Sequence, residues 1–226
     1  MTRATENTRP LILFGGTFDP VHRAHISCAL AVSKTFDNCT VQLLPNAAPP
    51  HRDTPMTDGL HRLAMLELAC AEFPELQVND WELRQTGLSY SIQTLEHFRK
   101  EIGAQPLILL IGADSLANLH TWHRWQDFAL LCHLVVAPRP GAETPASAVI
   151  EAFPEAPHSA LLQHANGLRL MLNGPTLDVS ATAIRHGLAE KGTSPAVNNQ
   201  VLDYIQRHHL YNAPLITRTY RTNEDS

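Results

Sequence analysis

Long apolar runs are missing from this sequence, and their absence sets the first limits on what the protein can be. No segment reaches the roughly 18 consecutive apolar residues that a membrane-spanning helix requires. The opening segment Met1–Pro10 is too polar for a secretory signal peptide. We therefore predict a cytoplasmic protein with no membrane partner.

Cysteine and positive charge are also scarce. The chain has 4 cysteines, which are widely spaced without a Cys-x-x-Cys pair, at Cys28, Cys39, Cys70 and Cys132. This spacing predicts reduced, mostly buried thiols. With 17 Lys and Arg against 22 Asp and Glu, the formal net charge is -5. We therefore expect no nucleic-acid partner, and any positive charge at a functional site must be local.

The sequence does contain a regular alternation of short aliphatic runs and segments with helical spacing. The aliphatic runs predict strands at 10–15, 40–45, 76–81, 107–112, 133–137 and 168–172. The helical spacing predicts helices at 23–35, 58–73, 91–102, 124–131, 180–190 and 198–208. The alternation indicates an α/β fold, a Rossmann-like doubly wound parallel sheet with C-terminal helices, and ligands at the carboxyl ends of the strands.

The 226 residues allow one domain with a substantial core. We place this domain at 11–211, between a polar N-terminal segment, 1–10, and a polar tail, 212–226, that we expect to be flexible. The proline- and alanine-rich stretch Pro138–Ser159 is expected to be a surface excursion with room for a short helix, and not a domain boundary. Nothing in the sequence indicates the oligomeric state.

The most informative segment follows the first aliphatic run and leads into the first helical pattern. Its sequence is Gly15-Gly16-Thr17-Phe18-Asp19-Pro20-Val21-His22-Arg23-Ala24-His25. The glycines let the backbone approach a ligand closely, and the helix start points unpaired N–H groups and its positive dipole end at that ligand. His22 and His25 face the same side and can donate hydrogen bonds to phosphate oxygens. The segment predicts a phosphate-binding site.

Plainer interpretations of this segment stay open at this point. A Gly-Gly pair often marks only a turn. His-x-x-His can hold zinc, and the same spacing recurs at His120 and His123, so the pair alone is not specific. The segment is neither a P-loop, since it lacks Gly-Lys-Ser/Thr, nor the dinucleotide motif Gly-x-Gly-x-x-Gly.

A second segment with phosphate-binding chemistry lies far along the chain, at Val179-Ser180-Ala181-Thr182-Ala183-Ile184-Arg185. Ser180 is a favourable N-cap, and Thr182 and Arg185 follow within about one turn. Hydroxyls and a guanidinium at a helix start suit triphosphate oxygens. Taken alone, such a segment is more often an ordinary capped helix with a surface arginine.

Two segments near the second and third expected strands carry further polar side chains. Pro45-Asn46-Ala47-Ala48-Pro49-Pro50-His51-Arg52 follows the second strand. Its prolines would stiffen a loop that presents Asn46, His51 and Arg52 to a phosphorylated ligand, although a proline-rich turn with solvated basic residues is more common. Ser89-Tyr90-Ser91 precedes an expected helix and can simply cap it.

The fourth expected strand is followed by Ile111-Gly112-Ala113-Asp114-Ser115 and then by Thr121-Trp122-His123-Arg124-Trp125. Gly112 permits close approach of a ligand, and Asp114 can accept a hydrogen bond from a ribose hydroxyl. Trp122 offers a flat face to a heteroaromatic ring. Trp125, at helical spacing from Phe128, is expected in the core.

The two phosphate-binding segments resemble the Gly-Gly-x-Phe-Asp-Pro-x-His-x-Gly-His and Ile-Ser-x-Thr-x-Ile-Arg motifs of the nucleotidyltransferase superfamily. Only Ala24 departs from the first motif, where glycine is usual, and we expect tighter packing there without lost function. From about Leu11 to Tyr211, the loops resemble those of bacterial nicotinate mononucleotide adenylyltransferases. Ser91 replaces the usual threonine and keeps its hydroxyl, and His123 stands where tyrosine or another residue often follows the tryptophan.

This resemblance implies an enzyme of NAD biosynthesis that transfers AMP from ATP to nicotinate mononucleotide, giving deamido-NAD and pyrophosphate. The catalytic residues would be His22, His25 and Arg185. The ATP site would comprise Gly15, Gly16, Thr17, Phe18, Gly112, Asp114, Ser180 and Thr182. The mononucleotide site would comprise Asn46, His51, Arg52, Ser91, Trp122 and His123. Mg2+ would be carried with ATP, and we name no protein ligand for it.

Two other functions stay open. Another transferase of the superfamily, such as phosphopantetheine adenylyltransferase or a cytidylyltransferase, would share both phosphate motifs, but the Trp122 loop, the Pro-Pro-His51 loop and the longer chain argue against it. A non-catalytic nucleotide sensor built on the same fold would not need to keep His22, His25 and Arg185.

Overall fold

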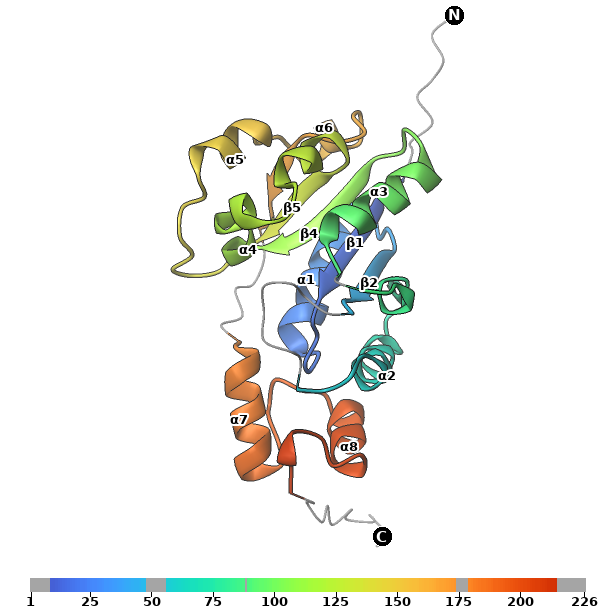
Figure 1. Cartoon of the computed structure of the whole chain (residues 1–226), viewed down its shortest axis with the longest axis vertical. Coiled ribbons are helices and arrows are strands. Elements are labelled where there is room, and N and C mark those ends of the chain that lie inside the picture. Colours follow the sequence, from blue (N-terminus) through green and yellow to red (C-terminus); the bar gives the residue numbers. More distant parts are fainter. Residues whose placement is uncertain (1–8, 48–55, 88, 174–178, 215–226) are drawn as a thin grey trace, which may run out of the picture.

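Six parallel strands form the centre of the molecule, which we describe from a computed structural model (Figure 1). The structure describes residues 9–47, 56–87, 89–173 and 179–214. The strands are β1 (Leu11–Gly16), β2 (Val41–Pro45), β3 (Leu76–Val78), β4 (Leu107–Gly112), β5 (His133–Ala137) and β6 (Arg169–Met171). Their order is β3-β2-β1-β4-β5-β6, and every neighbouring pair is parallel. The predicted Rossmann-like α/β fold is confirmed, with the strand order reversing between β1 and β4.

Helices cover both faces of this sheet. They are α1 (Arg23–Thr35), α2 (Gly59–Cys70), α3 (Ser91–Ile102), α4 (Ala113–Ala117), α5 (Ser147–Ala152), α6 (His158–Leu161), α7 (Ala181–Lys191) and α8 (Asn199–Arg207). Short 3-10 turns are η1 (Glu82–Arg84), η2 (Leu119–Thr121), η3 (Trp125–Leu130) and η4 (Leu210–Asn212). The predicted bounds of α1 and α3 are confirmed.

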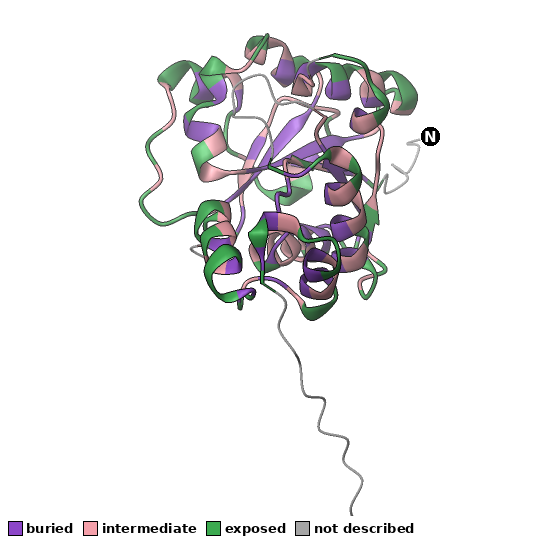
Figure 2. Ribbon diagram, turned by 60° about the horizontal axis from the view of Figure 1, so that its bottom comes forward, coloured by how far each residue is buried: buried purple, intermediate pink, exposed green. Residues whose placement is uncertain are grey.

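Alternate residues of each strand enter two separate cores. Ile12 packs with residues of α1, α2, α7 and α8, whereas Leu13 packs with residues of α3, η3 and α5. The sheet is therefore buried between the outer helices, as Figure 2 shows in purple. This burial on both sides explains why the strands are nearly continuous aliphatic runs in the sequence.

Some elements differ from their predicted form. The third strand ends at Val78 instead of residue 81, because Asn79 begins a hydrogen-bonded turn. The segment predicted as a helix at 124–131 is the 3-10 turn η3, and Trp125 there is half-buried against the core, as expected. The surface excursion after Ala137 contains α5 and leads into α6. None of the described helices is long and apolar enough to cross a membrane.

The C-terminal helices pack beneath the carboxyl edge of the sheet (Figure 1). A contact between residues far apart in the sequence anchors them to the loop after β1. The hydroxyl of Tyr211 donates to Oδ1 of Asp19 at 2.5 Å, which ties η4 to the first motif. The expected tail begins at Asn212, yet Asn212 ends η4 and Ala213 is buried in the core. The rest of that tail, 215–226, and the segment 1–8 lie outside the described residues.

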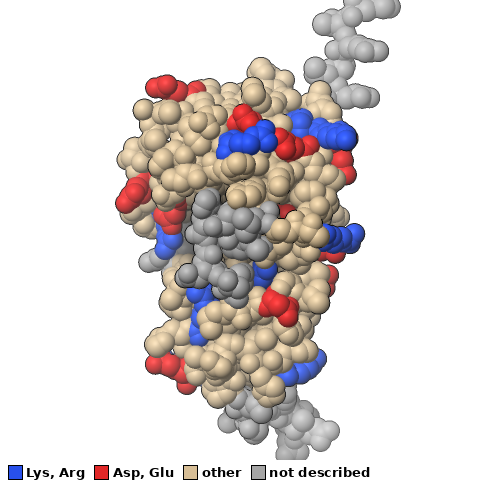
Figure 3. Space-filling view, in the orientation of Figure 1, with Lys and Arg blue, Asp and Glu red and all other residues tan. Residues whose placement is uncertain are grey.

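The thiols and the surface charge agree with the composition. All four cysteines are free, and three of them, Cys39, Cys70 and Cys132, are buried, as predicted. Burial raises the pKa of each thiol, that of Cys70 to about 12, so the thiols stay protonated and unreactive. Basic and acidic side chains of the described residues are interspersed on the face shown in Figure 3.

Candidate active site

A groove with two lobes lies at the carboxyl edge of the sheet, where β1 and β4 diverge. The smaller lobe has a volume of about 460 Å³ and is bounded by the turn before α3 and by η2. The larger lobe, about 870 Å³, is bounded by the first turns of α1 and α7 and by the segment after β5. The lobes share Gly15, Gly16, Thr17, Ile111, Asp114, Ser115 and Trp122. Doubly wound sheets bind ligands where the strand order reverses, and the groove lies at that point.

Gly15 and Gly16 are the last two residues of β1, and they have different roles there. A Cβ built at Gly15 would meet no heavy atom within 4 Å, so the space beside this residue is open. A Cβ at Gly16 would lie 3.0 Å from Cζ of Phe18, whose ring is buried. Gly15 therefore leaves room for a ligand, and Gly16 leaves room for a core ring. Gly112, at the end of β4, is open in the same way as Gly15.

The two histidines of the first motif stack on each other at the start of α1. Their ring centroids are 3.6 Å apart and the ring planes differ by 25°. His25 lines the larger lobe, whereas His22 is only 7% exposed. The main-chain N–H of His22 donates to Nδ1 of His25 at 3.3 Å. A neutral His25 ring therefore carries its proton on Nε2.

His22 is unusual because its ring is neutral and one ring nitrogen is buried without a hydrogen-bond partner among the described residues. Burial lowers its pKa to about 4, so the ring is uncharged near pH 7. Its Nδ1 is buried and has no hydrogen-bond partner among the described residues. Buried polar atoms without partners are rare in native structures. This nitrogen is therefore a candidate to receive or donate a hydrogen bond when a ligand binds.

The second motif meets the first one at the larger lobe, although the two are far apart in sequence. Nη1 of Arg185 donates to the carbonyl oxygen of Asp19 at 2.9 Å, and Nη2 donates to Oγ1 of Thr182 at 3.3 Å. Arg185 and Thr182 line the lobe. Ser180 instead caps α7, since its Oγ accepts from the N–H of Ala183 at 3.5 Å. The plain interpretation of Ser180 as an N-cap thus describes its observed contact.

Two helix N-termini open onto the larger lobe. Ala24 and His25 belong to the first turn of α1, and Ala181 and Thr182 belong to the first turn of α7. First-turn N–H groups carry partial positive charge, although in α1 those of Arg23 and His25 already donate to the carbonyl oxygens of Ala196 and His22. Together with the guanidinium of Arg185, they form a local region of positive potential that suits an anion.

Arg139 lines the larger lobe, although no sequence motif pointed to it. It follows β5 and lines the larger lobe beside Asp114, with which it forms an ion pair. Asp114 therefore faces both lobes and is paired with this guanidinium. The sequence signal that could have identified Arg139 is its place just after a predicted strand, because ligand-binding residues gather at the carboxyl ends of parallel strands.

The smaller lobe brings together four of the predicted mononucleotide-binding residues, Asn46, Ser91, Trp122 and His123. Ser91 is the first residue of α3, so the N-terminus of that helix opens onto the lobe. Trp122 is half-buried and packs edge-to-face on Phe128, with ring centroids 6.1 Å apart. The ring of His123 lies 4.7 Å from that of Tyr90.

A buried carboxyl group also faces the smaller lobe. Glu82 accepts hydrogen bonds from the hydroxyls of Ser89 at 2.5 Å and Thr94 at 2.7 Å. Burial raises the pKa of Glu82. These contacts fix the chain just before Ser91, and no sequence pattern pointed to them.

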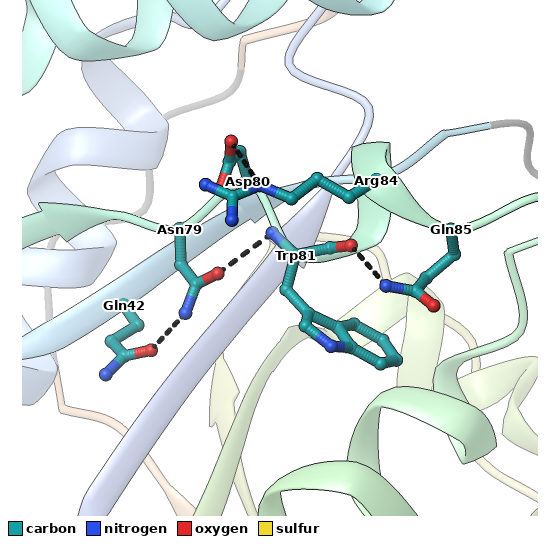
Figure 4. Close-up of polar contacts among 6 residues, drawn as sticks. All are labelled: Gln42, Asn79, Asp80, Trp81, Arg84 and Gln85. Carbon is teal, nitrogen blue, oxygen red and sulfur yellow. Dashed lines mark hydrogen bonds and ion pairs between the residues drawn. The ribbon is translucent and has the colours of Figure 1, made fainter.

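The turn that carries Glu82 is held by a polar network (Figure 4). Nδ2 of Asn79 donates to Oε1 of Gln42 in β2, and Oδ1 of Asn79 accepts from the N–H of Trp81. Gln85 donates from Nε2 to the carbonyl oxygen of Trp81. The turn is thereby linked to the sheet at β2.

Two predicted site residues, His51 and Arg52, lie outside the described residues. The described part of the chain contains no group of three or more His, Cys, Asp or Glu side chains that could hold a metal ion. The zinc interpretation of His22 and His25 therefore has no third ligand among these residues. Among the described residues, every other predicted site residue except His22 and Ser180 lines one or both lobes.

Comparison with known proteins agrees with this geometry. The family model described as cytidylyltransferase-like matches residues 13–187. A Pseudomonas fluorescens protein named "Probable nicotinate-nucleotide adenylyltransferase" is 42% identical over 214 residues, covering 89% of this chain and 97% of its own length. A protein of the same name from Idiomarina loihiensis is 36% identical over 204 residues, covering 88% and 98%.

A solved structure shares the fold. The nicotinic acid mononucleotide adenylyltransferase of Plasmodium falciparum, complexed with NaAD, has a TM-score of 0.73 at 15% sequence identity, and the match covers 91% of this chain and 98% of that one. At this identity the similarity concerns the fold alone.

Fold, groove and family match define the chain as a nucleotidyltransferase. The relatives are similar over nearly their whole length. Within that class, the chain belongs to the nicotinate-nucleotide adenylyltransferase family, and it is a transferase enzyme.

Proposed function

We propose that the groove transfers AMP from ATP to nicotinate mononucleotide, in NAD biosynthesis. The observation that carries this proposal is the convergence of two helix N-termini and two arginines on the larger lobe, directly beside a smaller lobe that contains Trp122. The larger lobe suits a triphosphate, and the smaller lobe suits a pyridine nucleotide. Membership in the adenylyltransferase family supports the same assignment.

The chemistry requires positioning more than a protein nucleophile. A 5'-phosphate oxygen of the mononucleotide attacks the α-phosphorus of ATP and forms the new P–O bond. The bond between the α-phosphorus and the oxygen that bridges to the β-phosphorus breaks, and its electron pair leaves with pyrophosphate. Because the attacking oxygen is already anionic, the protein's task is alignment and charge neutralisation.

Residues of the larger lobe would serve the triphosphate. His25 presents Nε2–H, and Arg185 and Thr182 lie on the opposite motif. We assign His22 as a hydrogen-bond donor to the transferred phosphoryl group, because one ring nitrogen is buried at the start of α1 without a partner among the described residues. This hydrogen bond would strengthen as negative charge builds on that group. Gly15, Gly16, Thr17 and Phe18 shape the loop beneath the phosphates, Gly112 and Asp114 would face the ribose, and Ser180 acts by fixing the start of α7.

Residues of the smaller lobe would bind the mononucleotide. The pyridine ring would stack on Trp122, and its carboxylate would face the N-terminus of α3 at Ser91 and the backbone near His123. A helix N-terminus favours a carboxylate over a neutral amide. Asn46 would contact the acceptor where the lobes join, and His51 and Arg52 remain proposed phosphate contacts.

Mg2+ would enter with ATP, bound to phosphate oxygens and water. Asp19, the buried carboxylate beside the larger lobe, is already engaged, since its two oxygens accept from Tyr211 and from the N–H of Met56. The described residues thus offer no dedicated cage for the ion. Free, mostly buried thiols support a cytoplasmic location.

The direct test is an acceptor panel. Purified protein is incubated with ATP, Mg2+ and one of nicotinate mononucleotide, nicotinamide mononucleotide, phosphopantetheine or no acceptor, and pyrophosphate release is followed. We expect release with nicotinate mononucleotide. Release only with phosphopantetheine would assign the chain to another transferase activity, and nucleotide binding without any release would indicate a sensor.

A further inference from the structure

The side chain of Arg62 lies beneath the groove and is almost completely inaccessible, with an exposed fraction of 1%. It belongs to the first turn of α2 and lines neither lobe. A fully buried guanidinium is costly unless each N–H has an acceptor. The acceptors of Arg62 therefore indicate what this residue holds in place.

These acceptors lie in three separate segments around the site. Nη1 donates to the carbonyl oxygen of Thr17 at 2.7 Å, and Nη2 donates to that of Asn46 at 2.7 Å. Longer contacts run from Nη2 to the carbonyl oxygen of Ala47 at 3.3 Å, from Nε to that of Thr57 at 3.2 Å and from Nη1 to Oδ1 of Asn46 at 3.5 Å. A guanidinium has five N–H donors in a fixed plane, and these contacts use all of that donor capacity.

The segments held by Arg62 bound both lobes. Thr17 lines both of them, and Asn46 lines the smaller one. Asn46 is also bonded to the first motif directly, from its N–H to the carbonyl oxygen of Gly16 at 3.0 Å. One rigid side chain thus fixes the loop after β1 relative to the loop after β2.

We propose that Arg62 is a positioning residue that sets the separation between the ATP-binding loop and the acceptor-binding loop. This inference rests on the proposed function, in which the two loops hold the two reactants. In-line attack tolerates little displacement, and a shift of about 1 Å can lower turnover on the order of 100-fold. Loss of Arg62 should therefore lower kcat more than it weakens the binding of either substrate alone.

The chain provides a matched control in Arg99. Like Arg62, it donates to several backbone carbonyls, here those of Leu131, Gly103, Gln105 and Ala165. These carbonyls precede β4, β5 and β6 and so lie at the amino edge of the sheet, away from the groove. Lysine at either position keeps the charge but cannot span several carbonyls in a plane.

The experiment compares Arg62→Lys, Arg62→Met and Arg99→Lys in the full chain. Methionine fills the space of Arg62 without an unpaired buried charge, so it tests the proposal if the lysine variant does not fold. We measure Tm, kcat, the separate dissociation constants of ATP and nicotinate mononucleotide, and amide hydrogen exchange in residues 14–20 and 41–47. We expect a drop of 10- to 100-fold in kcat, binding within about threefold of native, and faster exchange in both segments for the Arg62 variants only.

Native kcat in a folded Arg62 variant, or equal kinetic losses in Arg99→Lys, would overturn the proposal. Weaker binding of both substrates with unchanged kcat would also overturn the proposal. That result would mean that each loop is disturbed separately and that their separation does not limit turnover. If the native protein makes no dinucleotide, the proposed function fails, and the exchange measurement still decides whether Arg62 holds the two loops.

Discussion

At the scale of single residues, the burial of His22 constrains the chemistry most. The ring is neutral because desolvation lowers its pKa to about 4, and one of its nitrogens has no partner among the described residues. Negative charge that develops beside such a ring favours its protonated form and strengthens its hydrogen bond. His25, stacked against it, is oriented by the main-chain N–H of His22.

Replacing His22 by alanine should lower kcat on the order of 100-fold or more, because a preorganised donor to the transferred phosphoryl group is lost. The fold should persist, which circular dichroism can check. His120→Ala is the control, since His120 is exposed and has the same spacing to another histidine. Near-normal turnover of His22→Ala, or a variant that is simply unfolded, would contradict the assignment.

The pKa of His22 also predicts how stability depends on pH. Between its ordinary value of 6.5 and about 4, the unfolded chain binds a proton that the folded chain does not. The free energy of unfolding is therefore highest above pH 6.5 and falls as the pH drops to 4, by about 3 kcal/mol from this group. Urea unfolding at pH 7 and pH 4 should show a smaller loss in His22→Gln. The same loss in both proteins would show that His22 does not titrate in this way.

At the scale of elements, the two glycines that end β1 differ in the space beside them, since Gly15 borders the groove and Gly16 borders the core. Neither glycine has a positive φ, so what an added methyl group would meet decides the outcome. The helix starts of α1 and α7 then face the space that Gly15 leaves open. Strand, turn and helix therefore act together to bind an anion.

Gly15→Ala and Gly16→Ala should have different effects. At Gly15 the methyl group enters the groove and meets no atom of the described residues, so Tm should stay near native. The KM for ATP should rise about tenfold, because the methyl group would displace the bound nucleotide. At Gly16 it would meet the buried Phe18 ring, so stability should fall by about 1–3 kcal/mol. Thermal unfolding and ATP titration check both variants. A destabilised Gly15→Ala with native KM would reverse these roles.

Elements whose structure depends on local sequence pattern could be predicted from the sequence. Periodicity predicted the bounds of α1 and α3, whereas the paired glycines, read as part of a turn, are the last two residues of β1. Local pattern could not reveal buried charged side chains whose hydrogen-bond partners lie far away in the sequence. Arg62 sits at a polar position in a helical pattern, and its acceptors are carbonyls up to 45 residues away. Glu82 is similar, since only the folded turn brings Ser89 and Thr94 to its oxygens.

At the scale of the whole molecule, the site depends on segments from opposite ends of the chain. Asp19 of the first motif accepts from Arg185 through its carbonyl oxygen and from Tyr211 through its carboxylate. The sheet order places the resulting larger lobe beside the N-terminus of α3. Two ligands of different chemistry can therefore lie side by side across the shared residues.

This arrangement predicts a preference for the acid mononucleotide. An amide would turn donors toward the pocket N–H groups near Ser91, and each unpaired buried group costs about 1–3 kcal/mol, so two would favour the acid by about 30-fold or more. Catalytic efficiencies with nicotinate and nicotinamide mononucleotides measure this ratio. Trp122→Ala should raise the KM for the mononucleotide, whereas Trp125→Ala, outside both lobes, should not. Equal efficiencies would remove the carboxylate pocket.

If the groove joins AMP to nicotinate mononucleotide, the α-phosphorus of ATP must end in the dinucleotide. ATP labelled at that phosphorus is incubated with the protein and Mg2+, and the label and pyrophosphate are followed together. We expect the label to enter deamido-NAD in a one-to-one ratio with unlabelled pyrophosphate, and only when nicotinate mononucleotide is present. Label released as free AMP, or transferred to phosphopantetheine instead, would contradict it.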